Sequence, residues 1–463
     1  MNFFKISKFF LFASVLCIVV VTVSTLFPFI VGKYVWFRTS VDLALIFFLL
    51  GLLLNRQESA KNPSLPAGRD MNQRLKELFK RPLVIAVSIF AAVFLLACFF
   101  GVDPKWSFWS NFERGEGGFQ ILHFYLFFLL LVLLFREEKD WRNIFIMMLI
   151  GGAGMALYGV LAGFGVEHFI GVKFGEPSFR FQGSIGNSAY VAAFSIFAMF
   201  YSAYILLSKY RNKLFSLGAS VFWFSIALFL AVFFAAATRG AFLGLIAAIV
   251  VFVFYLVFNS RRWRKWLLGG VLFILLAAGS MIALKDASFV KSLPFSRVFD
   301  ISFTTKTFAD RAIMWETAIN GWKERPLLGW GPENYLKIFD RRFNVKYFNP
   351  AQGFGAWFDR AHNIYLDYLA ETGILGLLSF LGIWFVFFWQ FFKKKTLINA
   401  DKNIRINQQN QHEPAVLKAL ILALPVAYLV QGIVLFDVLP IYLNIFLFLA
   451  FVTYRFENFK FRN

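Results

Sequence analysis

The sequence predicts an all-α polytopic membrane protein with about twelve transmembrane helices and one large extracytoplasmic loop. Three observations lead to this fold class. Of the 463 residues, 59% are hydrophobic and only 16% are charged, whereas soluble domains have about a quarter charged residues. Apolar runs long enough to cross a bilayer, about 20 residues each, recur along the whole chain. Most Lys and Arg fall in short clusters between these runs, and we therefore expect one transmembrane domain over residues 1–463.

The apolar runs define the expected helices in order. The first run follows a basic start and has no small-residue cleavage site after it, so we expect a retained span and not a cleaved signal peptide. The expected spans are 9–31, 41–55, 82–101, 119–135, 142–163, 188–207, 214–236, 240–258, 266–284, 363–392, 415–436 and 440–454.

The basic clusters set the orientation of these spans. The segments 55–81, "REEKDWR", "SKYRNK", "SRRWRK" and "KKKTLINADKNIR" fall on one side together with both termini. Loops rich in Lys and Arg remain in the cytoplasm, so we expect cytoplasmic termini and cytoplasmic loops at 56–81 and 393–414. The net charge of +21 then belongs to loops that face anionic lipids, and it does not indicate nucleic-acid binding.

The segment 285–362 departs from the pattern of short loops. It lies on the external side in this topology, and long loops are usually functional. Within it, the apolar residues of 310–324 recur near helical spacing, which predicts a short amphipathic helix. Pro326 and the following "GWGPENYLKIF" predict a turn and a second short helix.

Three arginines on the expected outer side are candidates for binding an anion. Arg239 stands among apolar and small residues in "AAATRGAFLGL", Arg311 begins the amphipathic loop helix, and Arg180 precedes a glycine-containing turn. A guanidinium fork matches phosphate oxygens and stays charged at any pH. Each also has a structural alternative. Arg239 could reach lipid headgroups, Arg311 could pair with Asp310 or Glu316, and Arg180 could belong to a helix-capping turn.

His362 stands at the start of the tenth expected helix, in "RAHNIYLDYLAETGILGLL". A helix N-terminus disfavours the charged imidazolium, and a neutral imidazole is what a general base needs. Helical geometry places His362, Gly373 and Gly376 roughly on one face. Glycines on that face let another helix pack closely and hold the histidine in place. Spacing alone allows equally well an interfacial aromatic side chain that only meets lipid headgroups.

Several chemistries have no signal in the sequence. No cluster of His, Cys and carboxylates has metal-ligand spacing, and neither a P-loop nor a dinucleotide motif occurs, so we expect no metal and no cofactor. Cys17 and Cys98 lie inside apolar runs and imply no disulfide framework. The remaining histidines are expected to be structural or solvated: His123, His168 and His412.

Four local signatures resemble the O-antigen ligase/polymerase family of bacterial envelope proteins. "TRGAFLGL" is similar to the family's Ser/Thr-Arg-Gly helix start, "DRAIMWETAINGWKERPLLGWGPENY" to its Arg-x-x-x-Trp segment and Gly-x-Gly turn, and "RFQGSIGNSAY" to its Arg…Gly…Gly-Asn element. Ser188 stands where the family often has proline. The most specific match is His362-Asn363, nine residues, Gly373, two residues and Gly376, which fits the pattern of the ligase branch fully.

This resemblance implies a fold and a chemistry. Such proteins are membrane-embedded type-C glycosyltransferases, which move a glycan from undecaprenyl pyrophosphate to an acceptor outside the cytoplasmic membrane without nucleotide sugar or metal. By resemblance, His362 deprotonates the acceptor hydroxyl, and Arg239 and Arg311 bind the pyrophosphate and stabilise its developing charge. Arg180 and Asn363 are expected to help bind substrate. The expected partners are the lipid-linked glycan donor, a lipid or protein acceptor and membrane lipids.

Two other functions remain open at this point. A polysaccharide polymerase would join repeat units on the same carrier, and the full His-Asn…Gly…Gly pattern favours the ligase over it. A non-catalytic polysaccharide flippase or exporter would need charged cavities deep within the spans and no outer base. For each of these we expect a multi-pass protein of the cytoplasmic (inner) membrane, and for the enzymes an active site on the external or periplasmic face.

Overall fold

The computed structural model describes residues 2–61, 66–111, 114–166, 179–259, 264–291, 306–345, 357–400 and 415–458. Within these ranges every regular element is a helix and no strand occurs. Nine helices of the described chain are long and apolar enough to cross a membrane, and two shorter apolar helices accompany them. The prediction of an all-α polytopic membrane protein is therefore confirmed.

The chain runs through the following elements: α1 (Phe3–Ser14), the 3₁₀ helix η1 (Val15–Val19), α2 (Val31–Lys61), α3 (Pro66–Leu78), α4 (Pro82–Phe100), α5 (Pro104–Trp109), α6 (Gly118–Leu134), α7 (Glu138–Gly163), the 3₁₀ helix η2 (Gly183–Ile185), α8 (Ser188–Lys209), α9 (Leu217–Ala235), α10 (Arg239–Asn259), α11 (Arg264–Ala283), α12 (Ser288–Lys291), α13 (Lys306–Glu324), α14 (Tyr335–Arg341), α15 (Ile364–Ala400), α16 (Ala415–Gln431) and α17 (Leu439–Asn458).

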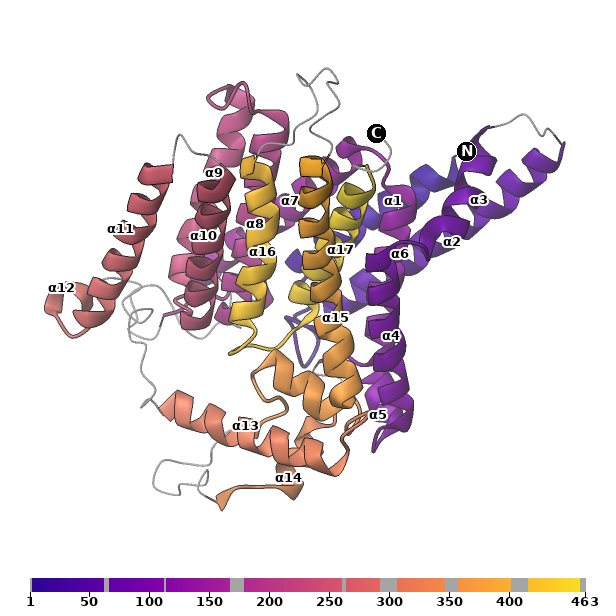
Figure 1. Ribbon diagram of the computed structural model, residues 1–463. Helices are drawn as coiled ribbons and strands as arrows, with labels where there is room; N and C mark the ends of the chain where they lie inside the picture. The colour runs from indigo at the N-terminus through magenta and orange to yellow at the C-terminus, as the bar shows by residue number, and fades with distance from the viewer. Residues whose placement is uncertain are drawn as a thin grey trace.

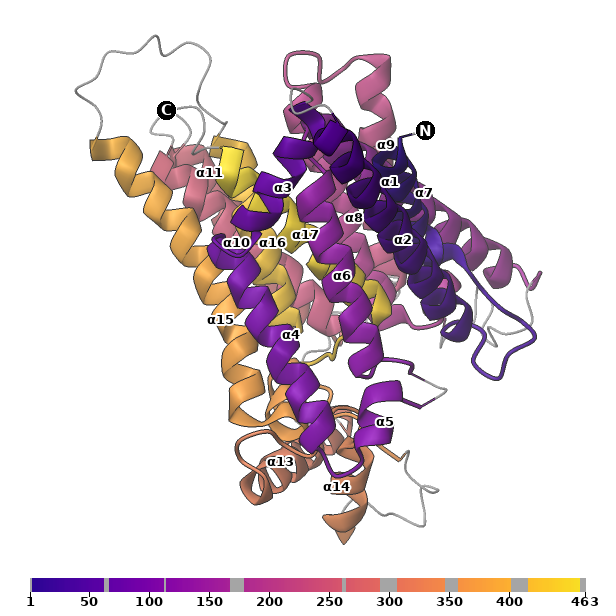
Figure 2. The ribbon, with the colours of Figure 1, turned by 90° about the vertical axis from the view of Figure 1, so that its right-hand side faces the viewer.

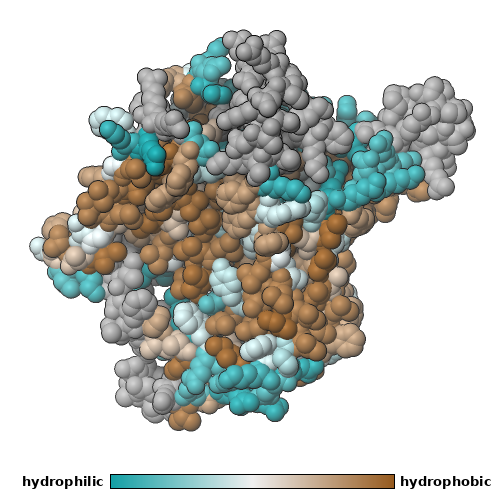
Figure 3. Space-filling view, viewed as in Figure 1, coloured by the Kyte–Doolittle hydropathy of each residue, from teal (hydrophilic) through white to brown (hydrophobic). Residues whose placement is uncertain are grey.

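The long helices stand side by side as one bundle with two distinct ends (Figure 1). The segment that contains α13 and α14 lies beneath the lower end, and α13 runs across the bundle axis (Figures 1 and 2). α1 begins and α17 ends at the opposite end (Figure 2). Apolar side chains cover much of the side of the bundle, and hydrophilic ones gather at the lower end (Figure 3). This distribution suits a protein surrounded by lipid along its sides and by water at its ends.

The centre of the bundle is built from α8 and α17. The most apolar stretch of α17 is 83% buried and that of α8 is 78% buried, whereas that of the peripheral α11 is 6% buried. Aromatic rings fill this centre: Phe145 stacks on Tyr201 with 4.5 Å between ring centroids, and Phe451 meets Tyr204 edge-on at 4.8 Å. Such rings bury large areas and interlock in preferred geometries, so they fix how the helices pack.

α10 packs against α16 through two glycines close to its start. A Cβ atom on Gly240 would come within 2.3 Å of the Val434 side chain, and one on Gly244 within 2.7 Å of the Ala427 carbonyl oxygen. Small residues let two helix backbones approach closely. The space beside Arg239 that these glycines leave is therefore occupied by α16 and the turn after it.

The first expected span, 9–31, is wrong in its bounds. The helix begins at Phe3 and ends as 3₁₀ turns at Val19, and residues 20–30 are non-helical before α2 begins. Pro28 has no backbone N–H, so it cannot continue the hydrogen bonds of a helix. The buried Lys33 ammonium donates to the Val20 carbonyl at 2.5 Å. Tertiary bonds to the side chain of Lys33 thus hold a bend that the apolar composition of this run does not reveal.

Each later expected span corresponds to one helix, although α2 extends well beyond the expected 41–55, and parts of the expected loops are helical. The segment 56–81 contains the end of α2 and all of α3. α15 continues to Ala400, and 401–414 lie outside the described residues. The amphipathic helix predicted at 310–324 is confirmed as part of α13, and the second short helix is α14. Expectations for 167–178, 292–305 and 346–356, His168 among them, fall outside the described residues, as does His412.

Candidate functional site

Four side chains singled out from the sequence gather at the end of the bundle that carries α13. We call them the basic cluster: Arg180, Arg239, Arg311 and His362. They come from the segment before η2, the start of α10, the second turn of α13 and the turn before α15. All four are partly exposed, so a ligand from outside can reach them. The structure thus joins residues that are far apart in the sequence.

Arg180 is anchored to the turn that precedes Arg239. Its guanidinium Nη2 donates to the Thr238 hydroxyl at 3.2 Å, and its Nε lies 3.4 Å from the Ala236 carbonyl oxygen. Next to it, the Phe181 amide donates to the Ala235 carbonyl at 3.0 Å. These contacts place the guanidinium of Arg180 at the α9–α10 turn.

Arg311 lies close to Arg239. Burial lowers the pKa of Arg311, and the like charge of Arg239 lowers it further. The expected alternative, an ion pair to a neighbouring carboxylate, does not occur, because among the described residues neither Asp310 nor Glu316 pairs with Arg311. Two guanidinium groups that approach each other are mutually repulsive. Their proximity therefore suits a bound anion.

His362 occupies a strained turn immediately before α15. Its φ angle is +55°, a left-handed conformation that costs free energy for a residue with a side chain and is found often at functional sites. The imidazole ring meets Phe436 edge-on at 5.0 Å and Phe358 edge-on at 5.5 Å between ring centroids. Two aromatic neighbours therefore fix the plane of the ring.

One hydrogen bond determines the tautomer of His362. Nδ1 lies 3.2 Å from the Arg360 carbonyl oxygen, which can only accept, so Nδ1 must carry the proton. In the neutral ring, Nε2 is then left with its lone pair. Burial lowers the pKa of His362, the bond to Arg360 opposes this, and the positive charge of Arg311 lowers the pKa again. Burial and the nearby positive charge thus favour the neutral imidazole over the imidazolium.

Asn363 caps the helix that His362 precedes. Its side-chain oxygen accepts from the Tyr365 amide at 3.0 Å and from the Leu366 amide at 3.1 Å. The Asp367 carboxylate, in the first turn of α15, accepts from the Ala361 amide at 2.7 Å and so ties the helix start to the segment before it. An Asn at this position stabilises a helix start. The structure thus gives the oxygen of Asn363 a positioning role at the start of α15, while its expected contact with substrate stays a prediction.

The two motif glycines support α15 differently from the expected contact with another helix. Gly373 has φ +67° and breaks α15, and a Cβ atom there would come within 2.2 Å of the Leu327 carbonyl oxygen. The break frees the Ile374 amide to donate to the Pro326 carbonyl at 2.8 Å. At Gly376 a Cβ atom would collide with the Thr372 side chain of the same helix. The expected shared face is wrong because the helix is interrupted at Gly373.

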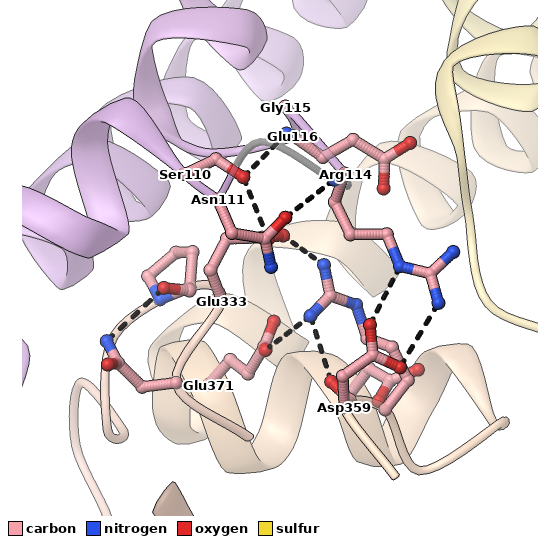
Figure 4. Close-up of polar contacts among 12 residues, drawn as sticks. Ser110, Asn111, Arg114, Gly115, Glu116, Glu333, Asp359 and Glu371 are labelled. Carbon is pink, nitrogen blue, oxygen red and sulfur yellow. Dashed lines mark hydrogen bonds and ion pairs between the residues drawn. The ribbon is translucent and has the colours of Figure 1, made fainter. Parts of the chain in front are cut away.

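Behind the basic cluster lies a second group of charges, which we call the Arg360 network. Arg360 is 5% exposed; its guanidinium pairs with Glu333 and, at 3.2 Å, with Glu371. Arg114 binds Asp359 with two parallel bonds of 2.7 and 3.2 Å. Figure 4 shows these carboxylates pointing toward the two guanidinium groups. Because the Arg360 carbonyl accepts from the imidazole of His362, this network helps to hold that ring in place.

The Arg360 network also contacts α5 and the loop that follows it. Ser110 donates to Glu333 at 2.9 Å and accepts from the Glu116 amide at 3.0 Å. Glu116 in turn accepts from the Leu439 amide at 2.8 Å. Burial raises the pKa of Glu116 to about 8, the negative charge of Glu333 adds to this, and Arg360 opposes it. Segments far apart in the chain thus meet around one guanidinium.

A cavity of about 20 Å³ lies within this network. Its walls include Arg360, Glu116, Glu333 and Phe436. That volume matches a single water molecule and is far too small for a sugar.

Sequence reasoning missed the Arg360 network. Arg360 stood two residues before His362 in the same quoted stretch, and Glu333 lies in "GWGPENY". No local spacing connects them, because the ion pairs join distant segments such as Arg114 and Asp359, 245 residues apart. The available signal was an uncommon run of charged residues beside a candidate base. His123, expected to be structural, lies in α6 with Nδ1 2.7 Å from the Phe119 carbonyl oxygen.

The fold and the two charged groups define a polytopic membrane protein with a partly exposed, positively charged site at one end. The family model described as O-antigen ligase matches residues 224–381. Residues 224–381 are therefore similar to the O-antigen ligase family, which supports the resemblance drawn from the motifs. The match contains Arg239, Arg311 and His362, and it supports a role in polysaccharide biosynthesis of the ligase or polymerase type. Among curated proteins no match was found.

Proposed function

We propose that this chain is an integral-membrane glycan ligase. It transfers an oligosaccharide or polysaccharide from undecaprenyl pyrophosphate to a hydroxyl or amide of a lipid or protein acceptor, on the external face of the cytoplasmic membrane. The observation that carries the proposal is the meeting of Arg239, Arg311 and His362 at one end of the bundle, all within the region that matches the O-antigen ligase family.

The arginines bind the carrier's pyrophosphate in this proposal. A pyrophosphate carries several negative charges, and guanidinium groups match its oxygens in pairs. Arg239 and Arg311 lie close together, so one pyrophosphate can contact both and relieve their repulsion. Arg180 adds positive charge from the α9–α10 turn. The undecaprenyl chain extends along the apolar side of the bundle, since it is as apolar as the lipid around it.

His362 acts as the general base. Nε2 takes the proton of the acceptor hydroxyl while the acceptor oxygen bonds to the anomeric carbon of the glycan. The bond from that carbon to the pyrophosphate breaks, and its electron pair leaves with the carrier. Charge that develops on the leaving oxygen is stabilised by Arg239 and Arg311. The glycosyl–pyrophosphate bond itself supplies the free energy of transfer.

A transfer assay tests the proposal. The purified chain is incubated in proteoliposomes with undecaprenyl-pyrophosphate-linked glycan and an acceptor, and the acceptor-linked product is measured. His362→Ala should lower turnover by about 10²–10⁴-fold, the usual contribution of a positioned base, with unchanged thermal unfolding. His123→Gln serves as the matched histidine control and should retain activity.

Two outcomes would contradict the proposal. Near-normal turnover in a well-folded His362→Ala variant would remove His362 as the base. Longer glycans on the carrier, with no acceptor-linked product, would show that the site joins repeat units and is a polymerase. Both products are separated by the same gel, so one experiment distinguishes them.

A further inference from the structure

An exposed aromatic surface lies beside the end of α14. Its centre is Trp357, which is 59% exposed. The indole ring stacks parallel to Phe343, with 5.5 Å between centroids and 11° between planes. We call Trp357, Phe343 and Asp340 the Trp357 surface. An exposed aromatic side chain of this size is more informative than scattered apolar residues, because its contact with water is unfavourable.

The ring of Trp357 is held in one orientation. Its indole N–H donates to the Asp340 carboxylate, and the buried Phe339 packs edge-on against it with 5.5 Å between centroids. Together with the stacking on Phe343, these two contacts fix the orientation of the indole ring. A rigid, partly exposed ring binds a ligand with little loss of side-chain entropy.

A row of aromatic contacts joins this surface to the base. Phe339 meets Phe358 at 6.1 Å, and Phe358 meets His362 at 5.5 Å. Trp357 is therefore separated from His362 by two packed rings, Phe339 and Phe358. The Trp357 surface is thus joined to His362 through packed side chains at the same end of the molecule.

The surroundings of Trp357 do not suit a membrane anchor. Asp340, Arg341 and Arg342 beside it are exposed and charged. α14 lies beneath the lower end of the bundle (Figure 1), where hydrophilic side chains gather (Figure 3). Tryptophans that anchor proteins in a bilayer lie at the edge of the apolar belt. The Trp357 surface is instead placed in the water-facing part of the molecule.

We propose that the Trp357 surface is a glycan-binding subsite that takes a pyranose ring. One face of a pyranose presents apolar C–H groups while its rim carries hydroxyls, so an aromatic ring with polar groups at its edge is complementary to it. Asp340 provides an acceptor at that edge. This inference rests on the proposed function, and the sugar belongs to either the carrier-linked glycan or the acceptor.

Binding of free glycan tests the subsite independently of turnover. The full-length protein in nanodiscs is titrated with glycan released from the carrier by mild acid, and separately with a soluble acceptor oligosaccharide. Saturation-transfer NMR reports which sugar protons contact the protein. Trp357→Ala should weaken binding of one of the two by about tenfold, the size expected for loss of one aromatic stacking contact. Trp357→Phe should retain most of the affinity, and KM should rise in the transfer assay while kcat stays within about twofold.

The control is Trp266→Ala. Trp266 is 79% exposed and begins the peripheral α11 at the other end of the bundle (Figure 1). Equal binding of both glycans to wild type and to a folded Trp357→Ala variant would overturn the inference. The inference would also be overturned if the Trp357→Ala variant lost affinity only for glycan-free lipid vesicles and bound both glycans normally. Normal transfer by His362→Ala would refute the proposed base and leave a Trp357-dependent affinity for glycan intact, so the two failures are distinguishable.

Discussion

Two regions at the same end of the bundle use arginine in opposite ways. In the Arg360 network, buried guanidinium groups meet carboxylates: burial alone would lower the pKa of Arg360, but Glu333 and Glu371 outweigh it and raise the pKa above its usual value. In the basic cluster, burial lowers the pKa of Arg311, and the like charge of Arg239 lowers it further. One region pairs its guanidinium groups with carboxylates, and the other brings two guanidinium groups close together where a ligand can reach them.

This difference separates structural arginines from binding ones. A buried charge is tolerated when its partners neutralise it, and removal of one partner leaves the other charge costly. A partly exposed guanidinium beside another cation contributes little to folding and has a strong affinity for phosphate oxygens. Variants in the Arg360 network should therefore reduce stability, and variants in the basic cluster should reduce binding and transfer.

The largest loss of stability is expected for Arg360→Gln. The substitution leaves Glu333 and Glu371 buried without their cation, which should lower the free energy of unfolding by about 3–5 kcal/mol. Thermal unfolding in detergent measures it. Arg342→Gln is the control, because Arg342 pairs with Glu324 at the surface while 45% of its side chain is exposed, and such pairs contribute below about 1 kcal/mol. Equal losses in both variants would abolish the distinction between the two regions.

A smaller loss is expected for Gly373→Ala. The left-handed φ and the contact with the Leu327 carbonyl both oppose a side chain, so we expect a destabilisation of about 1–3 kcal/mol. Gly382→Ala provides a control in the same helix, since a Cβ atom on Gly382 would meet nothing within 4 Å. It should be neutral or slightly stabilising. If Gly373→Ala unfolded at the wild-type temperature, the break in α15 at Gly373 would not be required for the contact between this helix and the loop at Leu327.

The smallest expected effect is electrostatic. The positive charge of Arg311 lowers the pKa of His362, because a nearby cation disfavours imidazolium. Arg311→Gln should therefore raise that pKa toward its ordinary value, and the acidic limb of kcat/KM should move to higher pH with it. Histidine NMR of the folded protein measures the pKa directly, with Arg341→Gln as the control. An unchanged or lower pKa in Arg311→Gln would place the two side chains too far apart to act on one substrate.

The sequence predicted the spans well and the tertiary details poorly, for physical reasons. Apolar runs mark the segments that contact lipid, and each expected span after the first therefore corresponds to a helix. The bend over residues 20–30 depends on Lys33, whose ammonium donates to the Val20 carbonyl at 2.5 Å and to the Ser184 carbonyl at 2.6 Å. A hydrogen bond between segments 151 residues apart leaves no trace in a hydropathy pattern.

In the candidate site too, residues marked by local motifs were predicted, and residues whose role depends on tertiary contacts were missed. Arg239, Arg311 and His362 were found because short motifs mark them locally. The role of Gly373 as a helix break was missed, since spacing along an ideal helix assumes that the helix is continuous. Arg360 was missed because its importance lies in ion pairs with Glu333 and Glu371, which only the fold brings together.

The most direct test of the account is the affinity for the carrier. Binding of undecaprenyl pyrophosphate in nanodiscs should be at least about tenfold weaker in Arg239→Gln and in Arg311→Gln, since each loses one charged contact to phosphate. Both variants should unfold at the wild-type temperature. If both bound the carrier as tightly as the wild-type protein, the basic cluster would not be the pyrophosphate site, and the assignment of these arginines would be contradicted.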